Sequence, residues 1–202
     1  IWGSGFRLVE RAIADELNVS RTPVRAAFER LFSEGLVELV PNKGAIVADV
    51  SIDEMLEILQ IREALEILAC SLAVPRLSPE EIRELEGRLG EMKKAVGEND
   101  LYYYSDLNNR FHQVFIEASG NRRLGRMLEA LKTQMVRYRM TSLLSPGRVP
   151  SSITEHEALV KAVIRSQMEN TPKHVEQAMQ EHLDGLRKAV LYAARREAFF
   201  SS

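Results

Sequence analysis

Hydrophobic and polar positions along the chain follow two different patterns, and the change comes near residue 50. From Ser51 onward, apolar side chains recur every three to four positions, which is typical of amphipathic helices. The first fifty residues mix this spacing with a shorter stretch that indicates strands. We therefore predict a mainly α fold with two domains, residues 1–50 and residues 51–202.

Helix starts in the second domain are marked by capping residues. Ser51, Ser78 and Thr154 each precede a Glu by three positions, which is the spacing of a capping box. Pro172 stands where the first residue of a further helix is expected. The predicted helices cover residues 52–74, 79–97, 100–118, 121–143, 155–168 and 172–199. Consecutive helices joined by short turns predict an all-helical bundle.

Two short helices with a tight turn between them are predicted near the start of the chain. Apolar residues over 9–17 have helical spacing. Ser20 can then cap a second helix over about 21–34, because its hydroxyl accepts a bond from the backbone amides of the first turn. In a helix-turn-helix the start of the second helix enters the major groove, where an arginine can fork onto guanine. The side chains at that start are Arg21, Thr22 and Arg25.

A β-hairpin is predicted directly after the second helix. Strand-forming residues over 36–40 and 45–50 flank the turn formers of residues 41–44. This hairpin forms a wing, with Lys43 and Gly44 at its tip. Basic side chains on a single amphipathic helix are commonly only a solvated surface. The order helix, turn, helix and wing favours DNA binding instead.

Composition narrows the classes further. The 202 residues carry 27 basic and 29 acidic side chains, so DNA binding has to depend on a local basic face. The single Cys70 allows no disulfide within the chain, which favours a reducing, cytoplasmic environment. No apolar stretch approaches the roughly 18 residues of a transmembrane helix, and no signal-peptide pattern stands at the N-terminus. We expect neither membrane insertion nor secretion.

The N-terminal motifs resemble the winged helix-turn-helix of the GntR family of bacterial transcription regulators. The resemblance rests on Arg7-Leu8-Val9-Glu10, Ala14–Arg25, Glu34-Gly35-Leu36-Val37 and Pro41–Ala45. It implies that Arg7, Arg21 and Arg25 contact operator DNA, and that the wing tip at Gly44 lies in or near the minor groove. Such domains begin with one more helix before Gly5, so we expect an upstream segment. A dimer on a two-fold operator is also expected.

Polar residues on the predicted helices of the second domain suggest a metal site. Asn108 and His112 lie four positions apart and therefore share one helix face, beside Phe111. His156 is predicted in the first turn of a later helix, and His182 in the middle of another. Three imidazoles and an amide oxygen can ligate a divalent ion. Histidines beside apolar neighbours can also simply pack in a core.

The second domain resembles the all-helical ligand-binding domain, called FCD, of the FadR subfamily of GntR regulators. The motifs are Arg62-x-x-Leu65-Glu66, Asn108-x-x-Phe111-His112, Ala118–Asn121, Glu155-His156 and Met179-x-x-His182-Leu183. Many members of this subfamily hold zinc or nickel with one Asp and three His. The matching positions here are Asn108, His112, His156 and His182. Because Asn108 is neutral, metal affinity should drop and the bound ion should attract an anionic ligand more strongly.

The sequence therefore predicts a dimeric transcription regulator whose affinity for DNA responds to a small organic acid, with a divalent metal as the expected cofactor. The resemblance implies repression that the ligand relieves. Basic residues that can bind the carboxylate, or can simply be solvated, are Arg62, Arg137 and Arg139. Two alternatives stay open: a constitutive repressor with a structural or empty sensor site, and a metal-dependent hydrolase, since metal-bound water can attack esters. A hydrolase needs a general base, and Glu155 and Glu157 are expected on other helix faces.

Overall fold

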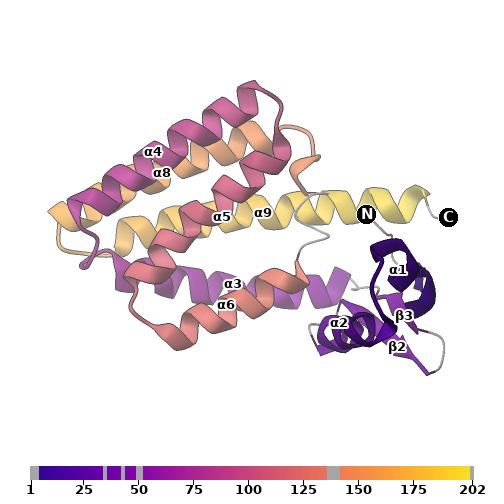
Figure 1. Ribbon diagram of the computed structural model, residues 1–202. Coiled ribbons are helices and arrows are strands. Elements are labelled where there is room, and N and C mark those ends of the chain that lie inside the picture. Colours follow the sequence, from indigo (N-terminus) through magenta and orange to yellow (C-terminus); the bar gives the residue numbers. More distant parts are fainter. Residues whose placement is uncertain (1–4, 34–35, 42–43, 49–51, 136–141, 201–202) are drawn as a thin grey trace.

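The computed structural model describes residues 5–33, 36–41, 44–48, 52–135 and 142–200. Figure 1 shows a small N-terminal head beside a larger helical bundle. The helices are α1 (Glu10–Leu17), α2 (Arg21–Ser33), α3 (Ile52–Ala73), α4 (Pro79–Gly97), α5 (Leu101–Ala118), α6 (Arg122–Gln134), α8 (Arg148–Met168) and α9 (Lys173–Phe200), and the strands are β1 (Arg7–Leu8), β2 (Val37–Val40) and β3 (Gly44–Val47). The predicted mainly α fold, with a winged helix-turn-helix before an all-helical bundle, is confirmed.

The head combines α1 and α2 with a three-stranded sheet in the order β1-β3-β2. The predicted hairpin is confirmed, because β2 pairs antiparallel with β3 and Val40 stands opposite Gly44. Strand β1 was not predicted, since two residues are too few to show an alternating pattern. It pairs with β3 on the other side, with Arg7 opposite Ile46. The buried core of the head consists of Leu8, Ala14, Val24, Phe28, Val37 and Ala45.

Two residues with positive φ shape the head. Asn18 ends α1 in the left-handed conformation, with φ of 53°, and its amide donates to the carbonyl oxygens of Ala14 and Asp15. Asparagine tolerates this conformation better than most residues, so the turn into α2 can be short. Gly44 has φ of 98°, and a Cβ there would collide with the carbonyl oxygen of Leu8. Only glycine lets the wing strand approach β1 so closely.

Within the described residues, the bundle is built from α3, α4, α5, α6, α8 and α9. Helix α3 leads from the head into the bundle and packs against α5, α6 and α9, while α8 packs against α4 and α9 (Figure 1). The largest fully buried side chains include Tyr104, Phe111, Phe115, Met92 and Leu159. The capping box at Ser78 is confirmed, because its amide donates to the carboxylate of Glu81 and its hydroxyl accepts from the Glu81 amide. In the described part of the chain, no helix is both long and apolar enough to cross a membrane.

The helix boundaries between residues 120 and 160 differ from the prediction. The helix predicted over 121–143 ends at Gln134, and the helix predicted from residue 155 already begins at Arg148. Thr154 therefore lies inside α8 and caps nothing. Pro150 falls in the first turn of α8, where its missing N–H group needs no partner, so it does not break the helix. The helix start expected at Ser51 lies outside the described residues.

Gln167 joins two segments that are far apart in the sequence. Its side-chain amide donates to the carbonyl oxygens of Val74 and Leu77, at 2.9 and 2.8 Å, and so satisfies the turn between α3 and α4. We expect Gln167→Met to lower the free energy of unfolding by about 1–3 kcal/mol, because two partly buried carbonyls lose their donor. Urea unfolding measures this.

The matched control is Gln177→Met. Gln177 is exposed on α9 and binds only Glu181, in the next turn of the same helix. Its loss should change the free energy of unfolding by no more than about 0.5 kcal/mol. Equal effects of the two substitutions would contradict the role given to Gln167.

Candidate functional site

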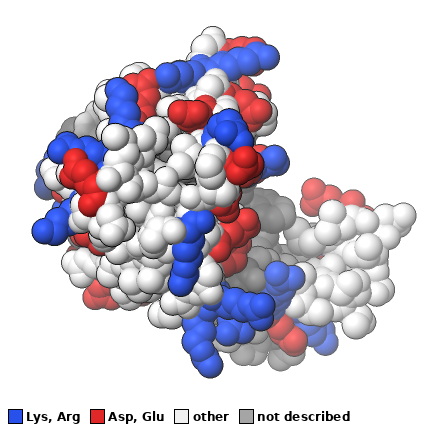
Figure 2. All heavy atoms as spheres, turned by 90° about the vertical axis from the view of Figure 1, so that its left-hand side faces the viewer, with Lys and Arg blue, Asp and Glu red and all other residues white. Residues whose placement is uncertain are grey.

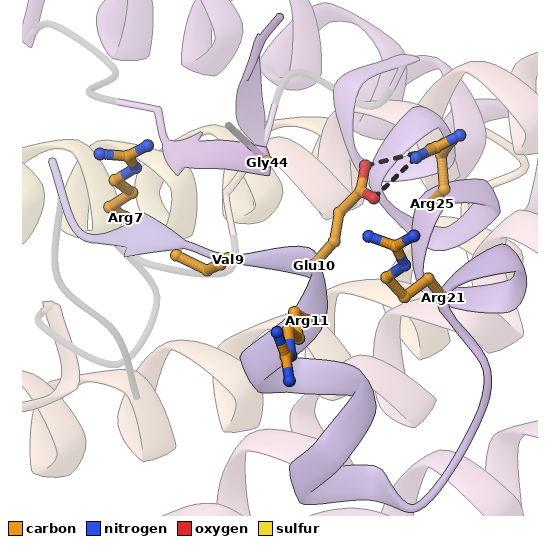
Figure 3. A pocket seen from close by; sticks show the side chains of 7 residues that line it. All are labelled: Arg7, Val9, Glu10, Arg11, Arg21, Arg25 and Gly44. Atoms are coloured by element: carbon orange, nitrogen blue, oxygen red, sulfur yellow. Dashed lines mark hydrogen bonds and ion pairs between the residues drawn. The ribbon is translucent and has the colours of Figure 1, made fainter. Parts of the chain in front are cut away.

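A cleft of about 460 Å³ lies on the head, between the first turns of α1 and α2 and the edge of the wing. Figure 3 shows the side chains that line it. They are Arg7, Val9, Glu10, Arg11, Arg21, Arg25 and Gly44. Four guanidinium groups and one carboxylate give this cleft a net positive charge, although the whole chain has a formal net charge of −2. The chain therefore has the local basic face that binding to phosphate groups requires.

The cleft brings together most of the residues that the sequence suggested for DNA contact. Arg7, Arg21, Arg25 and Gly44 all line it. Thr22 is exposed on α2 but does not line the cleft, and Lys43 lies outside the described residues.

Sequence reasoning missed three residues of the cleft, Val9, Glu10 and Arg11. Glu10 and Arg11 stand in the first turn of α1 and Val9 precedes it, whereas on the two helices the sequence argument considered only the start of α2. The sequence could have indicated them, because Arg7 was already predicted to contact DNA and the first turn of α1 follows Arg7 directly.

The single carboxylate of the cleft pairs with an arginine of α2. Glu10 accepts two hydrogen bonds from Arg25, from Nε to Oε1 at 3.1 Å and from Nη2 to Oε2 at 2.9 Å (Figure 3). The Glu10 side chain is 21% exposed and that of Arg25 is 62% exposed. The hydrogen bond from Arg25 lowers the pKa of Glu10, so this carboxylate is charged at neutral pH.

The opposite end of the molecule carries no comparable concentration of one charge. Figure 2 shows the end of the bundle farthest from the head, where basic and acidic side chains are interspersed around an area of uncharged ones. On α4, two pairs of opposite charge lie within the helix, Arg83 with Glu80 and Arg88 with Glu84. A face of this kind offers little attraction to a phosphate backbone.

A second candidate site lies inside the bundle, where three histidines meet. His112 on α5, His156 on α8 and His182 on α9 are all buried, and one ligand atom of each lies within 4.8 Å of the others. The ring centroids of His156 and His182 are 4.5 Å apart. His156 stands in the third turn of α8 rather than in the first, because the helix starts earlier than predicted.

Carboxylates lie beside Nδ1 of two of these imidazoles. His182 Nδ1 hydrogen-bonds to a carboxylate oxygen of Glu155 at 2.8 Å. His112 Nδ1 lies 3.0 Å from Oε2 of Glu66, an ion-pair distance without hydrogen-bond geometry. Glu155 was expected on another helix face, and this expectation was wrong. Gly185 on α9 leaves space for the Glu155 carboxylate, since a Cβ at Gly185 would lie 2.5 Å from Oε1 of Glu155. Both carboxylates were missed as site residues.

An arginine pairs with each of the two carboxylates. Arg62 binds Glu66 one turn away on α3, and Arg148 Nη1 lies 2.8 Å from both oxygens of Glu155. Burial alone would raise the pKa of Glu66, but the neighbouring Arg62 and His112 outweigh it and lower the pKa to about 2. Burial raises the pKa of Glu155, against the opposing effect of Arg148.

The third imidazole is held by the backbone. His156 Nδ1 lies 2.6 Å from the carbonyl oxygen of Ser152, one turn earlier on α8. Burial lowers the pKa of His156 to about 3, and burial together with the neighbouring imidazoles also lowers the pKa of His182 well below its usual value. Both rings are therefore neutral at physiological pH, the form in which an imidazole binds a metal.

The free ring nitrogens fit a divalent metal. The Nε2 atoms of His112 and His156 are buried and have no hydrogen-bond partner among the described residues. Metal-ligating histidines typically bind through one ring nitrogen while an oxygen holds the other. Three imidazoles in this arrangement form a donor set that suits zinc or nickel.

A small cavity of about 40 Å³ adjoins the histidines. Its wall includes His182 together with Asn108 from the predicted ligand set, and two arginines, Arg62 and Arg148. The hydroxyl of buried Tyr104, which also lines it, has no hydrogen-bond partner in the described part of the chain. The cavity therefore offers hydrogen-bond donors to a small anion, while its two arginines are each paired with a carboxylate.

Two of the arginines that the sequence suggested for binding the effector, Arg137 and Arg139, lie outside the described residues. Arg148 takes a place on the cavity wall that the sequence argument did not foresee, because the structure starts α8 at this residue. Asp106 on α5 is exposed and pairs with Arg110, so it does not join the histidines.

Comparison with known proteins covers nearly the whole chain. Residues 1–47 match the family model described as bacterial regulatory proteins, gntR family, and residues 57–185 match the model described as FCD domain. The HTH-type transcriptional regulator YdhC of Bacillus subtilis (strain 168) is 30% identical over 173 residues, which are 85% of this chain and 77% of YdhC.

Two proteins of Escherichia coli extend the similarity. The HTH-type transcriptional repressor RspR (strain K12) is 26% identical over 186 residues, which are 92% of this chain and 80% of RspR. The solved structure of E. coli McbR/YncC superposes with a TM-score of 0.76 at 27% identity, covering 92% of this chain and 88% of that one.

The buried neutral histidines predict how the metal-free protein responds to acid. The pKa of His156 is about 3 in the folded chain and about 6.5 in the unfolded one, so between these values the unfolded chain binds a proton that the folded chain does not. In the presence of chelator, the free energy of unfolding should therefore fall as pH drops, by up to about 1.4 kcal/mol per pH unit for this residue.

Urea unfolding at a series of pH values between about 4 and about 6 measures that slope. His156→Gln should show a smaller slope than the wild type. His174→Gln is the control, because His174 binds Glu169 at the surface, away from the cluster. A His156→Gln slope equal to that of the wild type would show that the native state does not exclude this proton.

Proposed function

The chain belongs to the GntR family of bacterial regulators and carries an FCD domain, and on this premise we propose that it binds operator DNA as a homodimer under the control of a small carboxylate. Its relatives are DNA-binding transcription regulators and not enzymes, so the hydrolase alternative falls away. The observation that carries the proposal is the cleft of four arginines on the helix-turn-helix. We assign DNA reading to residues 1–50, and sensing and dimerisation to residues 51–202, with the protein acting in the cytoplasm.

Contacts to DNA are proposed for both walls of the cleft. Arg21 and Arg25 at the start of α2 are placed to meet base edges in the major groove, where a forked arginine discriminates guanine. Arg7 and Arg11, on the neighbouring β1 and α1, are placed to meet phosphates. The remaining proposed contacts are Thr22, Lys43 and Gly44.

A divalent metal, zinc or nickel, is proposed for the histidine cluster. Its ligands would be His112, His156 and His182, with Asn108 as the fourth. All four side chains are neutral donors, so they leave the charge of the ion uncompensated. When bound, the metal would supply an electrophilic anchor for an anionic ligand.

The effector is proposed to be a small organic acid in the adjoining cavity. Arg62 and Arg148 line this cavity, and each already neutralises one buried carboxylate. The net positive charge that remains to be balanced is therefore that of the metal. A carboxylate supplies the negative charge that balances the metal, and it also matches the forked geometry of an arginine.

Helix α3 is the proposed route from the effector to the head. It carries Arg62 and Glu66 at the site, and it begins at Ile52, soon after β3 ends at Val47. A ligand can change the affinity for DNA only if it binds one arrangement of the two heads more tightly than another. We propose repression that the ligand relieves, which agrees with the name of the relative RspR as a repressor.

Arg21→Ala tests the assignment of the cleft. A duplex that the wild type enriches from a randomised library serves as the specific probe, and fluorescence anisotropy measures its dissociation constant. We expect the variant to bind this duplex about tenfold more weakly and to lose preference at one base position, because a forked contact to a base is removed. Arg83→Ala on α4 removes an arginine far from the cleft and should change nothing. Equal losses in both variants would contradict the assignment.

Metal content and thermal melts test the sensor. Elemental mass spectrometry of the untagged wild type should find about one zinc or nickel per chain, and His182→Ala should lack it. Acetate, lactate, succinate and citrate are then added to loaded and chelated protein. We expect at least one of them to raise the melting temperature of loaded protein only, because a ligand stabilises the state that it binds. Indifference to chelator and to every acid would favour a constitutive repressor instead.

A further inference from the structure

We propose that Glu10 is a specificity-determining residue of the DNA cleft, because it fixes Arg25 for reading a base and keeps that arginine from binding the phosphate backbone. This inference rests on the proposed function of the cleft in DNA binding. Glu10 places a carboxylate among the four arginines of a surface that otherwise favours anions. A negative charge there opposes phosphate binding, which supplies most of the affinity of such proteins.

Stabilising α1 does not by itself account for this carboxylate. An acidic side chain in the first turn of a helix interacts well with the helix dipole. Glu10, however, reaches across to α2 and pairs with a residue that follows it by fifteen positions. Figure 3 shows the two side chains pointing toward one another, with Arg21 beside them. The pair therefore sets the relation between the two helices at the surface that would face DNA.

The geometry of the pair decides which edge of Arg25 remains available. A guanidinium group has five N–H donors, and Glu10 occupies the one on Nε and one of the two on Nη2. Both donors of Nη1 and the second donor of Nη2 have no partner among the described residues. One donor of each of these nitrogens lies on the end of the group, and that end can still fork onto O6 and N7 of a guanine. The side edge, formed by Nε and Nη2, is unavailable to a phosphate.

The charge of Glu10 adds a second preference. Arg25 is 62% exposed, so without its partner the side chain would be free to swing toward the nearest phosphate. A phosphate near Arg25 also approaches the carboxylate and is repelled by it, whereas the edge of a base carries no net charge. Glu10 thus weakens binding to non-specific DNA more than it weakens binding to the preferred sequence.

Glu10→Gln in the full chain tests the inference. The probes are the duplex enriched by the wild type and a scrambled duplex of the same length and composition. We expect affinity for the scrambled duplex to rise roughly fivefold, with a salt dependence steeper by about 0.9, because one more phosphate contact becomes possible. The ratio of specific to scrambled affinity should fall about tenfold, the discrimination of one forked contact.

Two further variants separate position from charge. Glu16→Gln removes the same charge from the exposed face of α1, outside the cleft, and should leave the ratio unchanged. Glu10→Asp keeps the charge but is too short to hold both donors of Arg25. It should therefore bind the specific duplex more weakly, without the gain on the scrambled one. Thermal melts of each variant confirm that it is folded.

The outcomes are distinct. A ratio for Glu10→Gln within twofold of the wild type, or equal shifts in Glu10→Gln and Glu16→Gln, would overturn the inference while leaving the proposed function intact. A wild type that enriches no sequence from the library would contradict the proposed function itself, and the inference with it.

Discussion

A buried imidazole needs a partner for each ring nitrogen, and three of them packed together leave few ways to meet this need. In this bundle the groups next to the Nδ1 atoms are one backbone carbonyl and two carboxylates, on the side away from the shared centre. The helices α3, α5, α8 and α9 must therefore keep their registers together. A slip of one helix by a single turn would leave a buried polar group without a partner, which costs more than most losses of apolar contact.

Ion pairs between arginine and glutamate hold polar side chains in both candidate sites, the cleft of the head and the histidine cluster of the bundle. An acid fixes an arginine in the cleft of the head, where Glu10 binds Arg25, and in the bundle, where Arg62 binds Glu66 and Arg148 binds Glu155. Side chains as long as arginine lose considerable conformational entropy when they are fixed, so a bidentate acid is an effective way to hold them. In the bundle the arginines also keep the charge close to neutral around the imidazoles.

Much of this arrangement was visible in the sequence, but only where the signal is local. The helix-turn-helix, the wing and the capping box at Ser78 depend on neighbouring residues, and each was predicted. The triad of histidines was also predicted, since the motifs matched position by position. The start of α8 was missed because the capping-box spacing of Thr154 and Glu157 indicated a helix start at a place that lies inside α8.

Residues whose role depends on contacts between distant segments could not be predicted. Glu66 and Glu155 join the site only because α3, α5, α8 and α9 meet at one point. Strand β1, with its two residues, has no pattern of its own and exists through pairing with β3. The space at Gly185 gives no signal until Glu155 is known to lie opposite it.

The pairing of α3 with α9 also dictates an order of events during synthesis. The described core of the head is made by residues among the first fifty, so it can form while the rest of the chain is still being made. The bundle begins with α3 but needs α9, its last helix, to cover that helix and to supply His182. Closing such a long stretch of chain is intrinsically slow. The surface proposed to face DNA can therefore fold before the centre proposed to control it.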